Sequence, residues 1–320
     1  LWEKLRACLK EGVFMKKDSY AARLWQNVKR HKGLYLMILP IVAYYLVFCY
    51  YPMYGAQIAF RDYTPKLGVL HSPWAGLKHF AEFFKSVYFE RLIRNTLSIN
   101  LKNLLFGFPA PILLALLLNE VRSQGYKKFV QTVSYMPHFI STVVIAGMVL
   151  QFTATDGFLT QLMTLFGYPK QNLMMNPSFF QPIYVISDIW QGIGWGSIIY
   201  IAAIAGINSE LYEAARMDGA GRWKQMIHVT LPGILPTIIT MFILRVGNMM
   251  NLGFEKIILL YNSSIYETAD VISTYVYRKG LVDQSYSFST AVGLFNSVIN
   301  LTLLFIANKL CKRLTEHSLW

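Results

Sequence analysis

Polar side chains inside long apolar stretches are the residues of this sequence with the clearest chemical potential. Arg245, Asn248 and Asn251 follow one another at steps of three, which places them on one face of a helix. A charged residue inside a membrane span is costly and usually faces the protein interior or a water-filled path. One interpretation of the pattern is a path for a polar solute. A second interpretation is that these residues hold helices together, with Arg245 satisfied by Asp188.

Two other apolar stretches carry polar or aromatic residues that extend this candidate path. Sugars bind to aromatic faces together with hydrogen-bonding amide and guanidinium groups, and a basic path would suit an acidic sugar such as a uronate oligomer. The candidate path residues are Asp188, Trp190, Gln191, Trp195, Arg245, Asn248, Asn251, Asn296 and Asn300.

A second candidate site lies in the polar loop that separates the fourth apolar stretch from the fifth. Residues 213–217 are strongly helix-forming, and Asp218-Gly219 is a turn that lets the chain reverse. A second amphipathic stretch follows and ends at Leu231-Pro232. The sequence predicts a helix-turn-helix with small residues at its tip, where another protein can approach the backbone closely. A plain connector between spans is the alternative.

Lipid is the solvent that the composition indicates for the elements carrying these residues. Of 320 residues, 54% are apolar and only 15% are charged, whereas soluble proteins carry about 25% charged residues. Such a chain is not disordered, collagen-like or a nucleic-acid arm, and its net charge of +13 reflects basic cytoplasmic loops. Cys8, Cys49 and Cys311 share no metal-ligand spacing and are expected to be free thiols.

Six apolar stretches are long enough to cross a bilayer, which takes about 20 residues. Placing both termini in the cytoplasm puts 18 Lys and Arg in the inside segments, against 10 in the outside loops. We therefore expect an all-α membrane protein with both termini cytoplasmic. The predicted spans are residues 34–51, 96–118, 133–152, 183–206, 234–252 and 288–308.

The spans imply a simple organisation of the chain. The first span lacks a small-residue cleavage site and is predicted to be an uncleaved anchor. Apolar residues at helical spacing predict an interfacial helix over 79–94, after a loop with turns at Thr64-Pro65 and Ser72-Pro73. The predicted parts are a basic cytoplasmic segment (1–33), the first span with its extracytoplasmic loop and interfacial helix (34–94), a transmembrane core (95–308) containing the cytoplasmic loop (207–232), and a cytoplasmic tail (309–320).

The loop between the fourth and fifth spans resembles the EAA loop of ABC importer permeases. It has Glu213-Ala214-Ala215, Gly219 four residues after the second alanine, and Leu231-Pro232 at its end; only Val229 replaces the usual isoleucine. Further stretches resemble one branch of the carbohydrate importers, the oligosaccharide and polysaccharide permeases of the alginate and rhamnogalacturonan type. These stretches are residues 51–55, 59–63, 72–77 and 318–320.

The resemblance implies a type I permease of six spans in a bacterial plasma membrane. It implies four kinds of partner: a second related permease, two ATPase subunits, an extracytoplasmic sugar-binding protein and an oligosaccharide. It also implies that the loop is a coupling helix docking into an ATPase, with Glu213 pairing with a basic group there. The coupling residues that it implies are Glu213, Ala214, Ala215, Met217, Asp218, Gly219 and Ala220.

The sequence itself argues against catalysis by this chain. It contains no Gly-Lys dipeptide and hence no P-loop, so ATP and Mg are expected on the partner ATPase and no cofactor on this chain. Its six histidines form no metal-ligand cluster. Gly192 and Gly196 have the spacing of close helix packing. The alternatives are a permease for a non-sugar solute and an ATP-independent membrane carrier.

Overall fold

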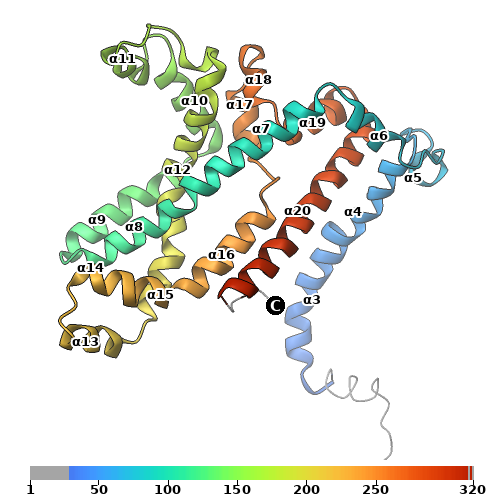
Figure 1. The fold of residues 1–320 in the computed structure, drawn as a ribbon. Helices are drawn as coiled ribbons and strands as arrows, with labels where there is room; N and C mark the ends of the chain where they lie inside the picture. Colours follow the sequence, from blue (N-terminus) through green and yellow to red (C-terminus); the bar gives the residue numbers. More distant parts are fainter. Residues whose placement is uncertain (1–28, 316–317, 319–320) are drawn as a thin grey trace, which may run out of the picture. The chain divides into compact units, whose positions relative to one another are not determined.

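The computed structural model describes residues 29–315 and 318, and these residues are helical with no strand beyond an isolated bridge between Arg61 and Trp74 (Figure 1). Most of the basic segment 1–33, with Cys8, lies outside the described residues, as do Leu319 and Trp320. Cys49 and Cys311 are free thiols, as expected.

The chain divides into two compact units, Leu1–Gln57 and Ile58–Trp320. The described part of the first unit consists of α3 (Lys32–Tyr44), a π-helix (Tyr45–Tyr50) and α4 (Tyr51–Met53). With the 3-10 turn that follows, they form a 29-residue helix that is long and apolar enough to span a membrane.

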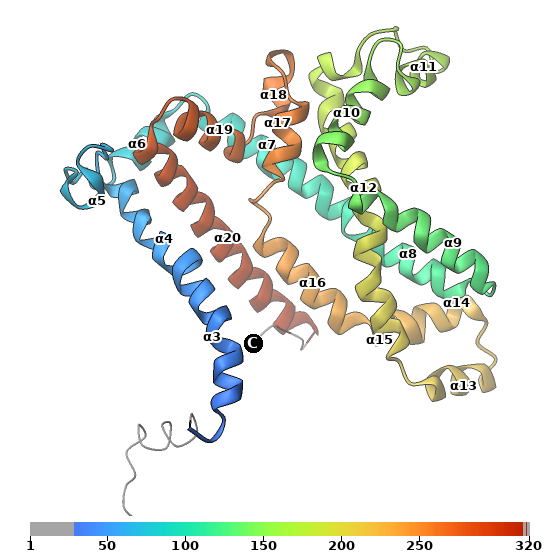
Figure 2. The same ribbon diagram turned by 180° about the vertical axis from the view of Figure 1, so that it is seen from behind.

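The second unit is built on three long helical segments. The first runs from α7 (Phe89–Lys102) through a π-helix (Asn103–Gly107) into α8 (Pro109–Glu120). The others are α12 (Pro177–Ala205) and α20 (Tyr286–Thr315). Helix α12 packs along α8, and α20 runs side by side with α16 (Leu235–Gly247) in both views (Figures 1 and 2).

Four helices of the described chain are long and apolar enough to span a membrane, and six when each of two bent pairs counts as one span. One pair joins α12 to α13 (Ser209–Met217) with a 71° bend. The other joins a helical run that contains α14 (Arg222–Gln225) and α15 (Leu231–Gly233) to α16 with a 58° bend. The all-α membrane architecture predicted from the sequence is confirmed.

The third predicted span is not one continuous helix. The chain forms α9 (Gln124–Tyr135), a 3-10 turn (Met136–Phe139) and α10 (Thr142–Thr153). Pro137 stands at the start of the 3-10 turn, where it has no amide hydrogen to continue α9. The Ser141 hydroxyl then accepts a hydrogen bond from the Val144 amide and begins a new helix.

The predicted interfacial helix over 79–94 is likewise two helices. Helix α6 (Lys78–Lys85) ends at Ser86, whose backbone is extended and whose hydroxyl accepts a hydrogen bond from the Tyr88 amide. Helix α7 then begins and continues directly into the membrane span. The apolar spacing runs across the break because Phe83 and Leu92 both belong to the same buried cluster.

Two glycines on α12 allow close approach of neighbouring segments. Only one of them, Gly196, belongs to the pair predicted from the sequence to pack closely. A Cβ on Gly194 would clash with the carbonyl oxygen of Ser134 in α9, and one on Gly196 would lie 3.0 Å from Pro111 in α8. Gly192 has open space, so its predicted packing role is wrong.

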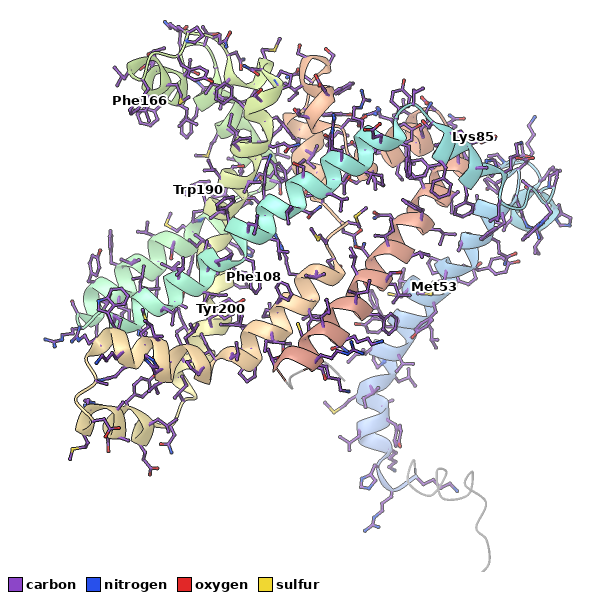
Figure 3. The ribbon with its side chains drawn as sticks, in the orientation of Figure 1. Met53, Lys85, Phe108, Phe166, Trp190 and Tyr200 are labelled. Carbon is purple, nitrogen blue, oxygen red and sulfur yellow. The ribbon has the colours of Figure 1, made fainter. Side chains whose placement is uncertain are left out.

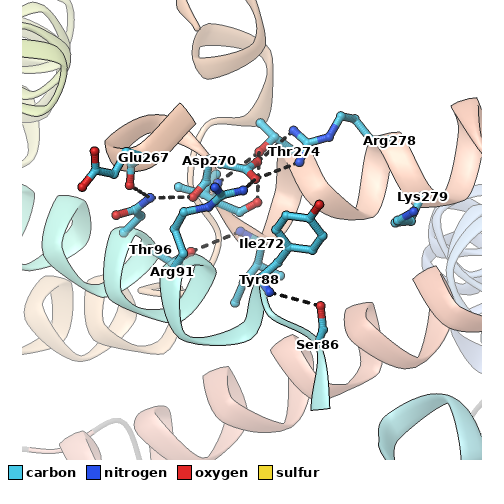
Figure 4. A network of polar contacts seen from close by, with 12 residues as sticks. Ser86, Tyr88, Arg91, Thr96, Glu267, Asp270, Ile272, Thr274, Arg278 and Lys279 are labelled. Carbon is cyan, nitrogen blue, oxygen red and sulfur yellow. Dashed lines mark hydrogen bonds and ion pairs between the residues drawn. The ribbon is translucent and has the colours of Figure 1, made fainter. Parts of the chain in front are cut away.

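Between α16 and α20 the chain folds into α17 (Phe254–Leu260), α18 (Tyr266–Ala269), α19 (Ile272–Tyr277) and a π-helix (Arg278–Val282). An ion-pair network, shown in Figure 4, joins this region to the first turns of α7. The wholly buried Asp270 carboxylate accepts two hydrogen bonds of 2.8 Å from Arg278 and one of 3.0 Å from Arg91. The network fixes the α17–α19 segment against the membrane span.

Candidate functional site

Two adjoining cavities lie among the membrane-spanning helices of the second unit. Their volumes are about 360 and 190 Å³. The larger is within the range typical of small-molecule sites. It is lined in part by Phe108 and Tyr200, which Figure 3 labels. The residues that line both cavities are Asn103, Asp188, Arg245 and Asn248.

The side chain of Arg245 lines these cavities, and its guanidinium is unpaired within the described chain. It stands in the last turn of α16 and is exposed. Among the described residues, its guanidinium has no hydrogen-bond or ion-pair partner, and no carboxylate oxygen lies within 4.0 Å of it. The alternative in which Asp188 satisfies Arg245 is therefore wrong for this conformation.

Asp188 in α12 has other partners. Its Oδ2 accepts a 3.0 Å hydrogen bond from Asn103 Nδ2, and its Oδ1 lies 3.7 Å from Lys256 Nζ. The same ammonium lies 3.5 Å from the Gln191 side-chain oxygen. About a third of the Asp188 side chain is exposed. The carboxylate is thus held from two sides while one side faces the cavities.

The sequence analysis missed Asn103, which lines both cavities, and Lys256, which lines neither but pairs with Asp188. Asn103 begins the π-helix of the second span, a feature frequent at functional sites. A Cβ on Gly107 would lie 2.6 Å from the Asn103 side-chain oxygen, so Gly107 leaves room for this side chain. Asn100 and Asn103, three residues apart in an apolar span, were a usable signal. Lys256 lies beyond the predicted end of the fifth span, and no sequence pattern there indicated that it contacts a membrane-spanning helix.

The remaining predicted path residues are distributed more widely. Asn251 lines the smaller cavity and accepts a 2.9 Å hydrogen bond from Asn296. Asn300 is buried, and its side-chain oxygen accepts a 2.8 Å hydrogen bond from the Met250 amide, which ties α20 to the segment after α16. Trp190 and Trp195 line neither cavity; both are about half exposed, and Trp195 stacks on His138 with ring centroids 4.5 Å apart.

The predicted helix-turn-helix is present as α13, a turn and α14. The Gly219 amide donates to the Arg216 carbonyl and the Ala220 amide donates to the Ala215 carbonyl, a Schellman closure. It requires a left-handed residue, and Gly219 supplies it with φ of +75°. The sequence therefore encodes a sharp end to α13 at the predicted position.

Helix α13 is mostly exposed. It buries no residue within the chain, and Met217 is 89% exposed. Glu213 is exposed and forms no ion pair within the described part of the chain. Asn208 caps the helix and Glu210 is the acidic residue of its first turn, so Glu213 is not needed to start the helix.

A family model described as "Binding-protein-dependent transport system inner membrane component" matches residues 107–316. The chain belongs to this family. The match covers the helix-turn-helix and three of the residues that line both cavities, Asp188, Arg245 and Asn248. It begins after Arg91 of the ion-pair network and after Asn103. The predicted placement in the inner membrane is confirmed.

Relatives and solved structures agree with this membership. The permease is 46% identical to the "Polygalacturonan/rhamnogalacturonan transport system permease protein YteP" of Bacillus subtilis, with 97% of each chain covered. It is 46% identical to protein LplB of the same organism, with 92% of each covered. The crystal structure of a bacterial ABC transporter involved in the import of the acidic polysaccharide alginate matches with a TM-score of 0.84 and 46% identity, covering 92% of this chain and 99% of that one.

A second solved structure shows a bacterial alginate ABC transporter in complex with an alginate pentasaccharide-bound periplasmic protein, with a TM-score of 0.84 and 45% identity; 93% of this chain and all of that one are covered. This chain is accordingly the membrane permease of an ABC importer, and the ATPase is a separate subunit. The predicted partners, a second permease, ATPases and a binding protein, follow from the same comparisons. Within the described residues, no group of three or more His, Cys, Asp or Glu side chains is arranged to hold a metal ion.

Proposed function

We propose that this permease carries an acidic oligosaccharide, a short chain of uronic acid residues, into the cytoplasm. The observation that carries the proposal is the unpaired guanidinium of Arg245 in cavities whose other polar side chains are amides, two tyrosines and one carboxylate. A guanidinium binds a carboxylate in a charge-assisted, bidentate manner. Asn103, Asn248 and Asp188 offer hydrogen-bonding groups that suit sugar hydroxyls. Relatives named for polygalacturonan and alginate support an acidic substrate.

Transport in this proposal is driven from the α13 loop. Both termini and this loop lie on the cytoplasmic side, and ATP with Mg is bound by the partner ATPase. Glu213 pairs with a basic group of that subunit, while the small residues Ala214, Ala215 and Gly219 allow close packing. Most of α13 is exposed, including Glu213 and Ala214, which supports such a docking role. Closure of the ATPase dimer then rotates the permease halves between inward and outward openings.

The experiment that tests the substrate measures uptake into proteoliposomes. The complete transporter with its binding protein is supplied with labelled oligogalacturonide, and Arg245→Ala is compared with wild type. The expected loss is about tenfold to a hundredfold, because a hydrogen bond to a charged group contributes about 1.5–3 kcal/mol. Arg245→Lys should retain more uptake, since it keeps the charge.

Arg122→Ala removes an exposed arginine that lines neither cavity and serves as the matched control. It should transport normally. Normal uptake by Arg245→Ala, in a complex assembled to the wild-type level, would remove Arg245 from the path and with it the argument for an acidic substrate.

A further inference from the structure

Lys256 places a buried ammonium group behind the cavity wall that Asp188 forms. It belongs to α17, is only 4% exposed, and lines neither cavity. Besides its contacts with Asp188 and Gln191, its Nζ lies 5.5 Å from the centroid of the Tyr184 ring. All three partners are on α12. A buried cation requires an opposing charge, and in the described chain Asp188 is the carboxylate that supplies it.

Asp188 therefore stands between two cations. Lys256 lies on one side of its carboxylate. On the other side are the cavities that Asp188 and Arg245 both line. The 3.7 Å separation from Lys256 is longer than a hydrogen bond, so this ion pair alone does not fix the carboxylate. The 3.0 Å hydrogen bond from Asn103 fixes the second oxygen. Together these two contacts hold the carboxylate against α17 and the second span.

Without Lys256, the charge of Asp188 would face Arg245, the other charged residue that lines both cavities. Opposite charges attract strongly where water is limited, and both residues line the same two cavities. A carboxylate that turned to Arg245 would occupy the guanidinium. An anionic ligand would then have to displace that carboxylate before it could bind.

We infer that Lys256 is a positioning residue that keeps Asp188 away from Arg245 and thereby preserves the selectivity of the cavities for carboxylate-bearing sugars. The inference rests on the proposed acidic substrate. Lys256 does not contact the ligand. It acts through Asp188, which accepts hydrogen bonds from sugar hydroxyls while Arg245 binds the sugar carboxylate.

The test measures equilibrium binding of labelled trigalacturonate and of its methyl ester, which lacks the charges, to the complete detergent-solubilised transporter without its binding protein. Wild type should bind the acid more tightly than the ester. Lys256→Met keeps a side chain of similar length without the charge. Its affinity for the acid should fall about tenfold further than its affinity for the ester, because both lose the Asp188 hydrogen bonds and only the acid loses Arg245. Lys256→Arg should keep the preference for the acid.

The double variant Asp188→Asn/Lys256→Met tests whether Lys256 positions the Asp188 carboxylate or only stabilises the folded permease. It has no carboxylate to compete for Arg245, so its preference for the acid should return. Three results would overturn the inference: Lys256→Met keeps the preference, it loses affinity for acid and ester equally, or the double variant fails to regain the preference.

Arg245→Ala and wild type separate this inference from the proposed function. If wild type shows no preference for the acid, or Arg245→Ala retains one, the proposed acidic path itself fails. If both behave as expected and only the Lys256 variants do not, the path stands and the positioning role is refuted.

Discussion

Replacing Arg278 by methionine should destabilise the permease more than the same change at Arg91, although both arginines bind one carboxylate. Arg278 donates two hydrogen bonds of 2.8 Å to the two oxygens of Asp270, whereas Arg91 donates one of 3.0 Å (Figure 4). Each guanidinium also lies over tyrosine rings, Arg278 over two and Arg91 over one. Methionine keeps an apolar chain and removes only the cation.

The magnitude follows from the number of bonds lost. A hydrogen bond to a charged group contributes about 1.5–3 kcal/mol, and the lower figure applies because both arginines are about a quarter exposed. We expect losses of about 3 kcal/mol for Arg278→Met and about 1.5 kcal/mol for Arg91→Met. Burial lowers the pKa of Arg278, but the hydrogen bonds and charge of Asp270 outweigh burial and raise it above its ordinary value. The guanidinium therefore stays charged throughout any practical pH range.

The assay heats the purified transporter in detergent and measures the fraction that remains monodisperse by size-exclusion chromatography. Lys279→Met is the matched control, because the exposed Lys279–Asp283 pair contributes at most about 1 kcal/mol. The midpoint temperature should fall most for Arg278→Met, less for Arg91→Met and least for the control. Equal midpoints for the two arginine variants would refute the reasoning from hydrogen-bond number.

Three other changes test the α13 loop and the packing of α12. Glu213→Lys should abolish transport and leave the permease in the membrane; unchanged uptake would exclude a coupling role. Gly219→Val should lower substrate-stimulated ATPase activity, because valine rarely adopts φ of +75°, whereas Gly221→Val, at φ of −68° in open space, should not. Gly194→Ala should reduce the yield of folded permease on membrane extraction, because its Cβ would clash with the Ser134 carbonyl oxygen of α9. Gly192→Ala, whose Cβ meets open space, should not reduce the yield.

Local sequence signals were sufficient to predict the helix and the turn of the α13 loop. Its helix is capped by Asn208, ends where Gly219 permits a left-handed residue, and is separated from the next helix by small residues. Each of these features depends on neighbours within a few positions. The apolar stretches were predicted for a similar reason, since crossing a bilayer depends on length and composition alone.

Two breaks in helices show the limit of such signals. The chain leaves the helix after Tyr135 and again at Ser86, although apolar residues continue on both sides of each break. Periodicity reports which residues are buried, and it does not report whether the helix between them is continuous. At the first break, Pro137 lies within residues 133–152, which the sequence predicted as one span, and it has no amide hydrogen to continue the helix.

The sequence by itself determined that this protein is a helical membrane permease with a protruding loop, and it identified Arg245, Asn248 and Asp188 as polar residues at membrane depth. Only the tertiary structure decided which of them share a cavity and that Asp188 pairs with Lys256 and Asn103 instead of Arg245. These partners come from α17 and from the second span, 68 and 85 residues away in sequence. Charges of opposite sign are paired by distance in the folded chain, and that distance depends on how separate helices pack, which no local pattern records.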